Sequence, residues 1–509
     1  MKMRCFICIT FLVANANAQL LKETYKLGGS SSLPSSNSVS QIVIEGSKVF
    51  LGTDKGLNLT TDGGKTFQTN FGQNSPTGIS VNAVAVKGDT IVVAVSTTLD
   101  QSGTTYPVGK GLYASTDNGA TWTSQPQSLD SLRDSTVVFG IDTLKALPVT
   151  TAVNNISYDL AFHKGFLYTS NFAGGLRRST DLGKTWERVV IPPDYLDFIS
   201  ADSSYTFQLS PVSGNITSES NLNHRVFSVF SDGDSVLYVG TADGINKSTD
   251  NGHTWYKFDH QNQANPISGN FVVSINSQGL SGVHHIWAAT VNAEASDEVP
   301  ALSYSADGGL DWKQILSGHF FHGMAFYGDI VYGVSDDGLF RTSDYGHSSQ
   351  VITNVYDSRT GQSTLSPAFY AAATSGDTLW AGSSDGTVNG VDDGVEIDPA
   401  SWQVFRAFVP VAATHTTYFY PNPFSPHLDV GRIHYSVNKS QSTVTIRVYD
   451  FAMHVISTVL QNATRTTGEQ DEPWNGTDDG GKNVDNGVYF YSVALDGGNP
   501  IWGKILVVR

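Results

Sequence analysis

The sequence predicts an all-β protein, a seven-bladed β-propeller followed by a small β-sandwich. The first observation is a strand, an Asp-x-Gly turn and a second strand, which recur seven times between residues 38 and 410. The second is that two further short strands precede each copy, which completes a four-stranded unit. The third is a new pattern after residue 412, alternating strands with turns rich in Gly, Asn and Asp. Repeated four-stranded units typically stand radially and protect one another's edges, as in a propeller.

The composition excludes several classes of function. Of 509 residues, 39% are hydrophobic and 15% are charged, which is a globular composition. The formal net charge of −17 disfavours nucleic acid and anionic membranes, because no basic stripe neutralises phosphate. The two cysteines, Cys5 and Cys8, both lie near the start. Disulfide frameworks, cysteine-based metal clusters and a catalytic thiol are therefore excluded from the rest of the chain, and we expect no cofactor and no metal.

The N-terminus has the pattern of a secretory signal peptide. Lys2 and Arg4 precede the apolar run Phe6–Ala14, and an Ala-Asn-Ala step ends just before Gln19. The apolar run is too short to span a bilayer, and no transmembrane segment follows it. We therefore expect residues 1–18 to be removed and the mature protein to be exported, free of disulfides and soluble.

The repeated motif has the form S/T-x-D-x-G-x-T-W in its best copies. These are Gly56–Phe67, Gly111–Trp122, Gly175–Trp186 and Gly244–Trp255. The pattern resembles the Asp-box (BNR) repeat of sialidases and many other β-propellers. The Asp carboxylate can accept N–H bonds across the turn, the Gly permits positive φ, and the aromatic residue anchors the next strand. We expect structural hairpin turns rather than calcium ligands or catalytic acids, centred on Asp62, Asp117, Asp181, Asp250, Asp307, Asp344 and Asp392.

Long insertions indicate which face of the propeller carries function. The units are expected to begin near Ser38, Ser80, Asn154, His224, Asn270, His319 and Ser366. The insertions are Leu99–Lys110, Ser124–Val153, Val189–Asn223 and Val291–Pro300. All four fall after the second or the fourth strand of a unit, so they should project from the face opposite the Asp boxes. Elaborated loops on one face of a rigid scaffold are where binding sites usually lie.

Candidate ligand-binding residues lie at the starts of first strands and in the longest insertion. The candidates are Asn82, Tyr158, Tyr195, Tyr205, Arg225, Phe271 and His322. Aromatic residues among acids suit contact with carbohydrate or protein. The alternative for Tyr195 and Tyr205 is that they only pack their loop onto the propeller.

No catalytic set can be named from the sequence. A sialidase-like site would need three arginines, an acid Asp and a Tyr–Glu pair, and Arg225 alone could face the channel. A box-bearing xyloglucanase would need two propellers, whereas one is expected here. A generic glycosidase needs two carboxylates, which this acidic chain neither reveals nor excludes. His319 and His322 would point to opposite faces of a strand, which argues against a metal site.

The C-terminal region opens with Tyr420–Pro426 (YPNPFSP) and continues through Ile433–Val437, Val444–Leu460 and Trp474–Leu495 to Gly503–Arg509. These motifs resemble the FlgD-type Ig-like domain and the related C-terminal sorting domain of the type IX (Por) secretion system. The resemblance implies an Ig-like β-sandwich, export past the outer membrane with the secretion machinery as partner, and a bacterium of the Bacteroidetes–Chlorobi kind. About seven short strands are expected here, with a looser stretch near Ala463–Pro473 and a core that includes Trp474, Tyr489 and Tyr491.

Together these patterns predict a secreted or cell-surface propeller that binds a glycan or a protein without catalysis. The alternative is a secreted, sialidase-like glycoside hydrolase that uses two carboxylates on the elaborated face. A propeller like a photosystem assembly factor shares the repeat, but the C-terminal domain disfavours it. The expected segments are 1–18, the signal peptide; 19–37, a Ser/Gly-rich segment; 38–410, the propeller; 411–419, a linker; and 420–509, the sorting domain.

Overall fold

The computed structural model describes residues 30–508 except 32, 102–103, 212–220, 281, 365, 408–416 and 427–429. The expected signal peptide lies outside the described residues. All regular secondary structure in the described part is β, which confirms the all-β prediction. No helix among these residues is long and apolar enough to cross a membrane. The chain forms two compact units, residues 1–408 and 409–509, each described below by itself.

Within the described residues, the first unit contains seven antiparallel sheets, each built on four strands consecutive in the chain. Sheets 1 to 3 are β2 (Val39–Glu45), β3 (Lys48–Thr53), β4 (Gly56–Thr60) and β5 (Phe67–Thr69); β6 (Ser80–Lys87), β7 (Thr90–Gln101), β8 (Thr104–Ser115) and β9 (Thr123–Gln125); and β12 (Ser157–His163), β13 (Phe166–Asn171), β14 (Gly175–Ser179) and β15 (Glu187–Arg188). Sheets 4 and 5 are β18 (Val226–Asp232), β19 (Val236–Thr241), β20 (Gly244–Ser248) and β21 (Thr254–Phe258); and β22 (Phe271–Leu280), β23 (Val283–Val291), β24 (Ala301–Ser305) and β25 (Lys313–Ile315). Sheets 6 and 7 are β26 (Phe321–Tyr327), β27 (Ile330–Ser335), β28 (Leu339–Thr342) and β29 (Gln350–Ile352); and β32 (Phe369–Ser375), β33 (Thr378–Ser383), β34 (Gly386–Val391) and β35 (Gln403–Phe405).

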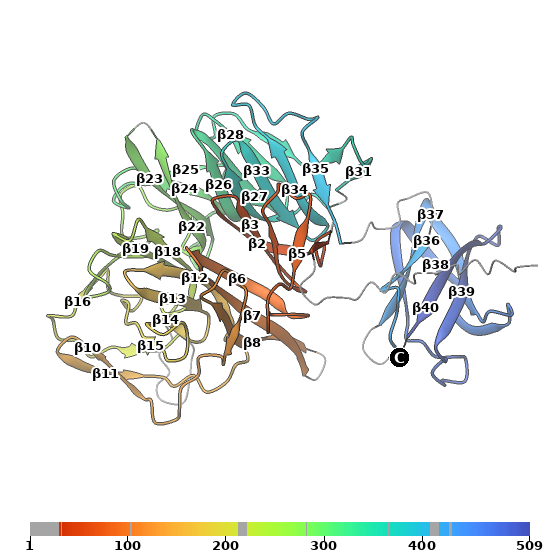
Figure 1. Ribbon diagram of the computed structural model, residues 1–509, viewed down its shortest axis with the longest axis horizontal. Helices are drawn as coiled ribbons and strands as arrows, with labels where there is room; N and C mark the ends of the chain where they lie inside the picture. The colour runs from red at the N-terminus through yellow and green to blue at the C-terminus, as the bar shows by residue number, and fades with distance from the viewer. Residues whose placement is uncertain are drawn as a thin grey trace, which may run out of the picture. The chain divides into compact units, whose positions relative to one another are not determined.

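The first strands of the sheets form a closed ring. Each first strand contacts the first strand of the next sheet, from β2 through β6, β12, β18, β22 and β26 to β32, and β32 contacts β2 again. Figure 1 shows these strands toward the middle of the unit, with the later strands outside them. This radial arrangement is that of a β-propeller, and it covers the faces of each sheet with its two neighbours.

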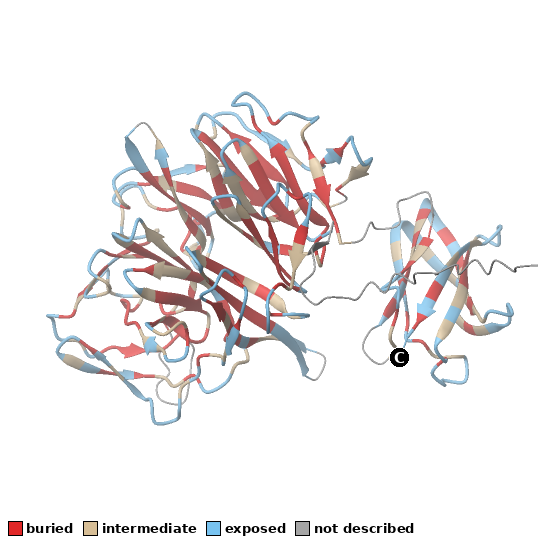
Figure 2. Cartoon of the chain, viewed as in Figure 1, coloured by how far each residue is buried: buried red, intermediate tan, exposed pale blue. Residues whose placement is uncertain are grey.

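Apolar side chains between neighbouring sheets form the core, and Figure 2 shows the buried residues as red bands along the strands. Every residue of β4 is buried, and so are the last five residues of β3. The ring closes in the same way: Phe405 of sheet 7 stacks on Trp380 at 5.5 Å and meets Phe67 of sheet 1 edge-on at 5.5 Å. A Cβ at Gly382 would lie 2.8 Å from Val39, so only glycine permits this close approach of the two sheets.

The motif turns share one hydrogen-bond pattern, illustrated by Asp117. Its Oδ1 accepts the Ser115 hydroxyl at 2.7 Å and the Thr121 N–H at 2.9 Å, while its Oδ2 accepts the Thr121 hydroxyl at 2.7 Å. The same three bonds occur at Asp62, Asp181, Asp250 and Asp344. Asp307 accepts the first two bonds but not the third, because Asp311 stands where the other copies have Thr or Ser.

Asp392 does not belong to this set, so its assignment as a box residue needs correction. Its carboxylate is buried and accepts hydrogen bonds from Arg341 at 2.6 and 2.9 Å and from the Tyr332 hydroxyl, both of sheet 6. The reason lies in the flanking residues. Gly390 stands where the other copies have a hydroxyl residue, and Glu396 stands where all but the Asp307 copy have one, so the carboxylate turns inward and joins sheet 7 to sheet 6.

The insertions are more ordered than the sequence suggests. Leu99–Lys110 is mostly a continuation of β7 and β8 rather than a loop. The two longest insertions contain β10 (Thr136–Phe139), β11 (Asp142–Ala146), β16 (Phe198–Ser200) and β17 (Gln208–Leu209). Strand β17 pairs with β11, and β16 extends sheet 4 beside β21. Further short strands are β1 (Ser30–Ser31), which pairs with β5, and the hairpin of β30 (Tyr356–Asp357) and β31 (Gln362–Ser363).

The second unit consists of β36 (Thr417–Tyr420), β37 (Gly431–Tyr449), β38 (Val455–Trp474), β39 (Gly487–Leu495) and β40 (Ile501–Val507). Five strands replace the expected seven, because β37 and β38 form one long hairpin whose register shifts absorb the irregular stretch near Ala463–Pro473. Strand β36 begins inside the expected linker 411–419, since its residues pair with Arg432–Tyr435 of β37. Trp474 and Tyr491 are buried in the core, and Tyr489 packs against it.

The Tyr420–Pro426 motif covers the outer edge of the last strand. Asn422 accepts the Leu506 N–H at 2.8 Å and donates to the Lys504 carbonyl at 2.9 Å. The Phe424 N–H donates to the Leu506 carbonyl at 2.8 Å, and the Phe424 ring is fully buried. An edge strand that is bonded in this way is protected from pairing with other chains.

The motif turns predict a loss of stability in acid. Hydrogen bonds from Thr121, Thr185 and Ser348 hold the pKa of Asp117, Asp181 and Asp344 at about 2, against ~3.9 in an unfolded chain. Because the unfolded chain then binds more protons, this stabilisation is complete above about pH 4 and is lost as pH falls toward 2. The thermal unfolding midpoint should fall over that window, and the triple variant Asp117→Asn, Asp181→Asn, Asp344→Asn should show a shallower fall. The exposed Asp54→Asn serves as control, and parallel curves for triple variant and wild type would contradict the prediction.

The covering of β40 predicts a local effect of Asn422→Ala. The variant removes two hydrogen bonds to the last strand. We therefore expect the free energy of unfolding to fall by about 1–2 kcal/mol and hydrogen exchange at the Leu506 amide to become faster. Exchange measured by NMR or mass spectrometry checks this. Asn475→Ala, which removes a local turn bond to Thr477, is the matched control. Equal exchange at Leu506 in both variants would show that Asn422 does not hold the strand.

Candidate functional site

The first strands of all seven sheets carry a β-bulge at the same place. In sheet 1, Val39 pairs with Thr53 and Gln41 with Gly52, which leaves Ser40 without an opposite residue. Such a bulge redirects the extra side chain, and bulges are frequent beside functional sites. The extra residues are Ser40, Asn82, Tyr158, Phe227, Val273, His322 and Tyr370. We call these seven residues the bulge ring.

The bulge ring surrounds one end of a central channel. The channel has a volume of about 890 Å³, and all seven first strands line it. The bulge ring lies where these strands begin, and we call this end the mouth. The connections after the second and fourth strands, from which the insertions arise, lie at the same end as the mouth, and the motif turns lie at the opposite end.

The first aromatic group at the mouth comprises Tyr158, Phe172, Phe227 and Phe271 from sheets 3, 4 and 5. The Phe227 ring lies 4.4 Å from Phe271, 5.2 Å from Tyr158 and 6.0 Å from Phe172. Tyr158 is 36% exposed, and the three phenylalanines are half-buried. The Arg225 guanidinium lies 5.5 Å from the centre of the Phe172 ring, and its Nε donates to the Pro211 carbonyl at 2.7 Å.

The second aromatic group comprises Phe320, His322 and Tyr370 from sheets 6 and 7. The His322 ring lies 4.9 Å from Phe320 and 5.1 Å from Tyr370. Its Nε2 lies 2.9 Å from a carboxylate oxygen of Asp336, on the turn between β27 and β28. The two groups therefore present aromatic surface to the mouth from different parts of the ring.

Asp159 is the carboxylate next to the bulge ring that lines the channel. It accepts the Val229 N–H at 3.0 Å and the Leu160 N–H at 2.9 Å, which joins sheet 3 to sheet 4. Burial raises the pKa of Asp159 to about 6 despite these bonds. Toward the opposite end of the channel, Lys87 and Asp234 form an ion pair at 2.7 Å.

The structure brings some of the expected site residues together. Asn82, Tyr158 and His322 belong to the bulge ring and line the channel. Phe271 and Arg225 lie beside it, against Phe227 and Phe172 respectively.

The two loop tyrosines lie elsewhere. Tyr195 is 66% exposed on the loop before β16. The Tyr205 hydroxyl accepts the Ser200 N–H at 2.9 Å, and its ring packs against Phe139 and Phe207, so this side chain holds its own loop in place.

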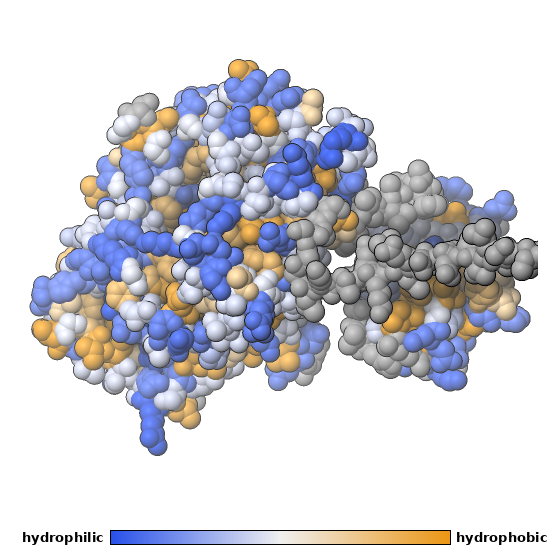
Figure 3. All heavy atoms as spheres, viewed as in Figure 1, coloured by the Kyte–Doolittle hydropathy of each residue, from blue (hydrophilic) through white to orange (hydrophobic). Residues whose placement is uncertain are grey.

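The residues of the site that the sequence did not indicate are Ser40, Asp159, Phe172, Phe227, Val273, Phe320, Asp336 and Tyr370. The first strands do contain a pattern that marks the members of the bulge ring. In each first strand the bulged residue directly follows a buried residue, as in Val226-Phe227 and Phe369-Tyr370. Aligning the first strands in this register would have identified all seven positions. Surface hydrophobicity gives less guidance, because Figure 3 shows hydrophilic and hydrophobic side chains interspersed on the visible face of this unit.

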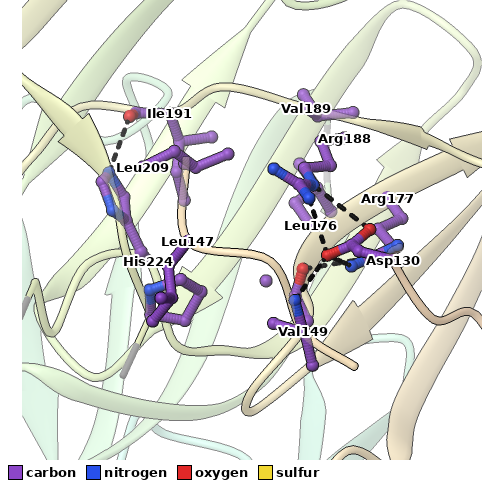
Figure 4. Close-up of a pocket in the computed structure, with 13 residues that line it drawn as sticks. Asp130, Leu147, Val149, Leu176, Arg177, Arg188, Val189, Ile191, Leu209 and His224 are labelled. Carbon is purple, nitrogen blue, oxygen red and sulfur yellow. Dashed lines mark hydrogen bonds and ion pairs between the residues drawn. The ribbon is translucent and has the colours of Figure 1, made fainter. Parts of the chain in front are cut away.

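A second cavity, shown in Figure 4, lies under the insertion Ser124–Val153. There the Asp130 carboxylate accepts hydrogen bonds or ion pairs from Arg177 at 2.9 Å, Arg188 at 2.8 Å and the Val149 N–H at 2.7 Å. Burial opposes ionisation, but the two guanidinium groups hold the pKa of Asp130 below its usual value. The cavity measures about 10 Å³, room for one water at most. This cluster anchors the insertion to sheet 3.

The described residues contain no group of three or more His, Cys, Asp or Glu side chains that could hold a metal ion. The groups at the mouth are aromatic faces, hydroxyl and amide groups and paired carboxylates. Such a set can bind a ligand through stacking and hydrogen bonds.

No protein-family model matches the chain. Over 232 residues it is 25% identical to the xyloglucanase Xgh74A of Acetivibrio thermocellus, a match that covers 40% of this chain and 24% of that protein. The chain thus spans about a quarter of the length of this curated relative.

Solved structures similar at low identity include the following two. One is PorZ, a surface component of the type-IX secretion system of Porphyromonas gingivalis, with 13% identity, 92% of this chain and 81% of that chain covered, and a TM-score of 0.33. The other is YCF48 from Cyanidioschyzon merolae, with 15% identity, 70% and 96% covered, and a TM-score of 0.41. At these levels the likenesses assign no activity or partner to this chain.

The anchoring cluster predicts a large effect of Asp130→Ala. The variant leaves Arg177 and Arg188 without their buried counter-charge. This should lower the free energy of unfolding by about 3 kcal/mol and expose residues 124–153 to proteolysis. Urea unfolding and limited proteolysis measure both effects. Glu187→Ala removes a surface pair with Arg178 and should cost less than about 1 kcal/mol. Equal losses in the two variants would contradict the anchoring role.

Proposed function

We propose that the first unit is a seven-bladed Asp-box propeller that binds a glycan or a protein at its channel mouth without catalysis. We further propose that residues 417–509 are an Ig-like sorting domain that directs the exported chain to the outside of the cell. The bulge ring is the observation that carries the binding proposal, because one backbone irregularity directs seven side chains into the same space.

The chemistry of the mouth supports recognition of a ligand. Ligand sites are concave and combine aromatic surface with a few polar groups. Tyr158, Phe227 and Tyr370 supply partly exposed aromatic surface, while Ser40 and Asn82 supply polar groups beside it. The first strands hold these side chains on a rigid ring, so little conformational entropy is lost on binding.

The second candidate function is glycoside hydrolysis. The weak similarity to a xyloglucanase favours it, and so do Asp159 and Asp336, two carboxylates at or next to the bulge ring. Against it, Asp159 is engaged by two backbone N–H groups, and Asp336 by His322. A general acid and a nucleophile must both reach the same glycosidic bond, and the backbone contacts of Asp159 hold its carboxylate between sheets 3 and 4.

The sorting role of the second unit rests on its sequence motifs and on their structural context. The YPNPF motif bonds the final strand along its edge through Asn422 and Phe424. A domain whose last strand is held in this way presents a defined C-terminal surface to an export machine. With the signal peptide expected at the N-terminus, this gives a secreted or surface location, and the secretion machinery is the proposed partner.

A binding and release assay tests the proposed function. The full chain, Phe227→Ala and the control Tyr195→Ala should be assayed against a panel of immobilised glycans and secreted proteins. We expect at least one ligand whose capture Phe227→Ala weakens about tenfold or more, corresponding to ~1.4 kcal/mol, while Tyr195→Ala leaves it unchanged.

Released sugar is measured in parallel. Release that is abolished by Asp159→Asn or Asp336→Asn would replace the binding role with hydrolysis. Capture that is equal in Phe227→Ala and wild type would place the site away from the mouth.

A further inference from the structure

The bulge ring contains no formally charged residue although the chain is strongly acidic. Its members include no Asp, Glu, Lys or Arg, in a chain with a formal net charge of −17. His322 of the ring faces Asp336 at 2.9 Å. A ligand at this position meets stacking surfaces and dipoles rather than an excess of one charge.

Several charged side chains around the mouth are paired, whereas Asp54 and Lys55 are exposed, consecutive residues of opposite charge on the turn after β3. On the turns that follow second strands, Asp243 pairs with Lys257 at 2.7 Å, Asp337 with His319 at 2.8 Å and Asp385 with Arg406. The Lys257 and Arg406 side chains are 1% and 3% exposed, so neither is available to a ligand. Arg225 is engaged by the Phe172 ring and the Pro211 carbonyl. Recognition of a carboxylate or sulfate calls for guanidinium or ammonium donors, and these cations are committed elsewhere.

The aromatic groups suit the flat faces of sugar rings. A pyranose ring has an apolar C–H face and a polar edge of hydroxyl groups, so stacking on an aromatic ring removes apolar surface from water. Phe227 with Tyr158 offers one such surface, and Tyr370 with His322 offers another in a different part of the ring. Two separated surfaces favour a chain of sugars over a single sugar.

Polar groups between the two surfaces can meet the hydroxyl edges. Ser40 and Asn82 lie in sheets 1 and 2, between the second and the first aromatic group around the closed ring. The Asn82 Oδ1 is buried and has no hydrogen-bond partner among the described residues, which leaves the amide nitrogen of Asn82 as its group toward a ligand. The Asp336 side chain is 60% exposed beside His322. Uncharged amides and hydroxyls, with a carboxylate that is hydrogen-bonded to His322, match neutral sugar hydroxyls.

We infer that the mouth binds a neutral polysaccharide chain, whose sugar rings stack on the two aromatic groups. This inference rests on the proposed function and names its ligand class. The channel volume of about 890 Å³ falls in the range of clefts for small ligands or single chains, ~300–1,000 Å³. A protein partner would instead need a contact surface of about 800 Å² on each side.

Affinity measurements with two polymers of opposite character test the inference. The full chain is titrated with hydroxyethyl cellulose, which is neutral, and with polygalacturonate, which is acidic. We expect binding of the neutral polymer, with Kd raised about tenfold in Phe227→Ala and in Tyr370→Ala. Tyr370→Phe, which keeps the ring, should bind like wild type, and so should the control Tyr195→Ala. Thermal unfolding of each variant separates loss of binding from loss of fold.

The outcomes distinguish this inference from the proposed function. Binding of polygalacturonate alone, still weakened by Phe227→Ala, overturns the neutral ligand class but leaves a ligand site at the mouth. Binding of neither polymer, with capture of a secreted protein that depends on Phe227, also overturns the inference and leaves the proposed function. Binding of the neutral polymer that neither Phe227→Ala nor Tyr370→Ala weakens overturns both.

Discussion

Seven separate sheets can enclose a channel only if the last packs against the first, and here side chains make that closure. Among the described residues, sheet 7 consists of β32–β35 alone and shares no strand with sheet 1. Phe405 packs between Trp380 and Phe67, Val39 approaches Gly382, and Asn37 bonds the backbone at Gly386 and Ala407. The positions of the first strands, and with them the mouth, depend on this seam. Apolar packing between sheets therefore stabilises the ring, rather than a hydrogen-bonded strand shared by the first and last sheets.

The bulges turn this ring into a candidate binding surface. A regular first strand would pair every residue with its neighbour strand, whereas the bulge leaves one residue of each strand unopposed and redirects it. The backbone repeats in all seven sheets, but the side chains at the bulge differ, from Ser40 to Tyr370. Specificity can thus change by substitution at these positions while the scaffold stays the same. The motif turns lie at the other ends of the strands, where their hydrogen bonds stabilise the scaffold.

Much of the fold could be predicted because local chemistry repeats in the sequence. The hydroxyl residue, Asp, Gly and Thr of the motif turns satisfy one another within seven residues, so each complete copy identifies its hairpin. The seventh copy of the motif shows the limit of this prediction. It keeps the Asp and the Gly but lacks both hydroxyl partners, and the Asp392 carboxylate pairs with Arg341 instead. The start of each first strand was predicted within three residues, but the bulge itself was not, because it is a property of pairing between two strands. The aromatic contact between Phe227 and Phe271 joins different sheets, and no local pattern could indicate it.

A crystal structure of the full chain with a bound neutral oligosaccharide decides whether ligand binds at the bulge ring. We expect sugar rings at the mouth, stacked on Phe227 or Tyr158 and on Tyr370, with hydroxyl groups near Asn82 or Asp336. Sugar bound instead on the insertions, for example against Tyr195, with the mouth unoccupied, would show that the bulge ring is not the binding site.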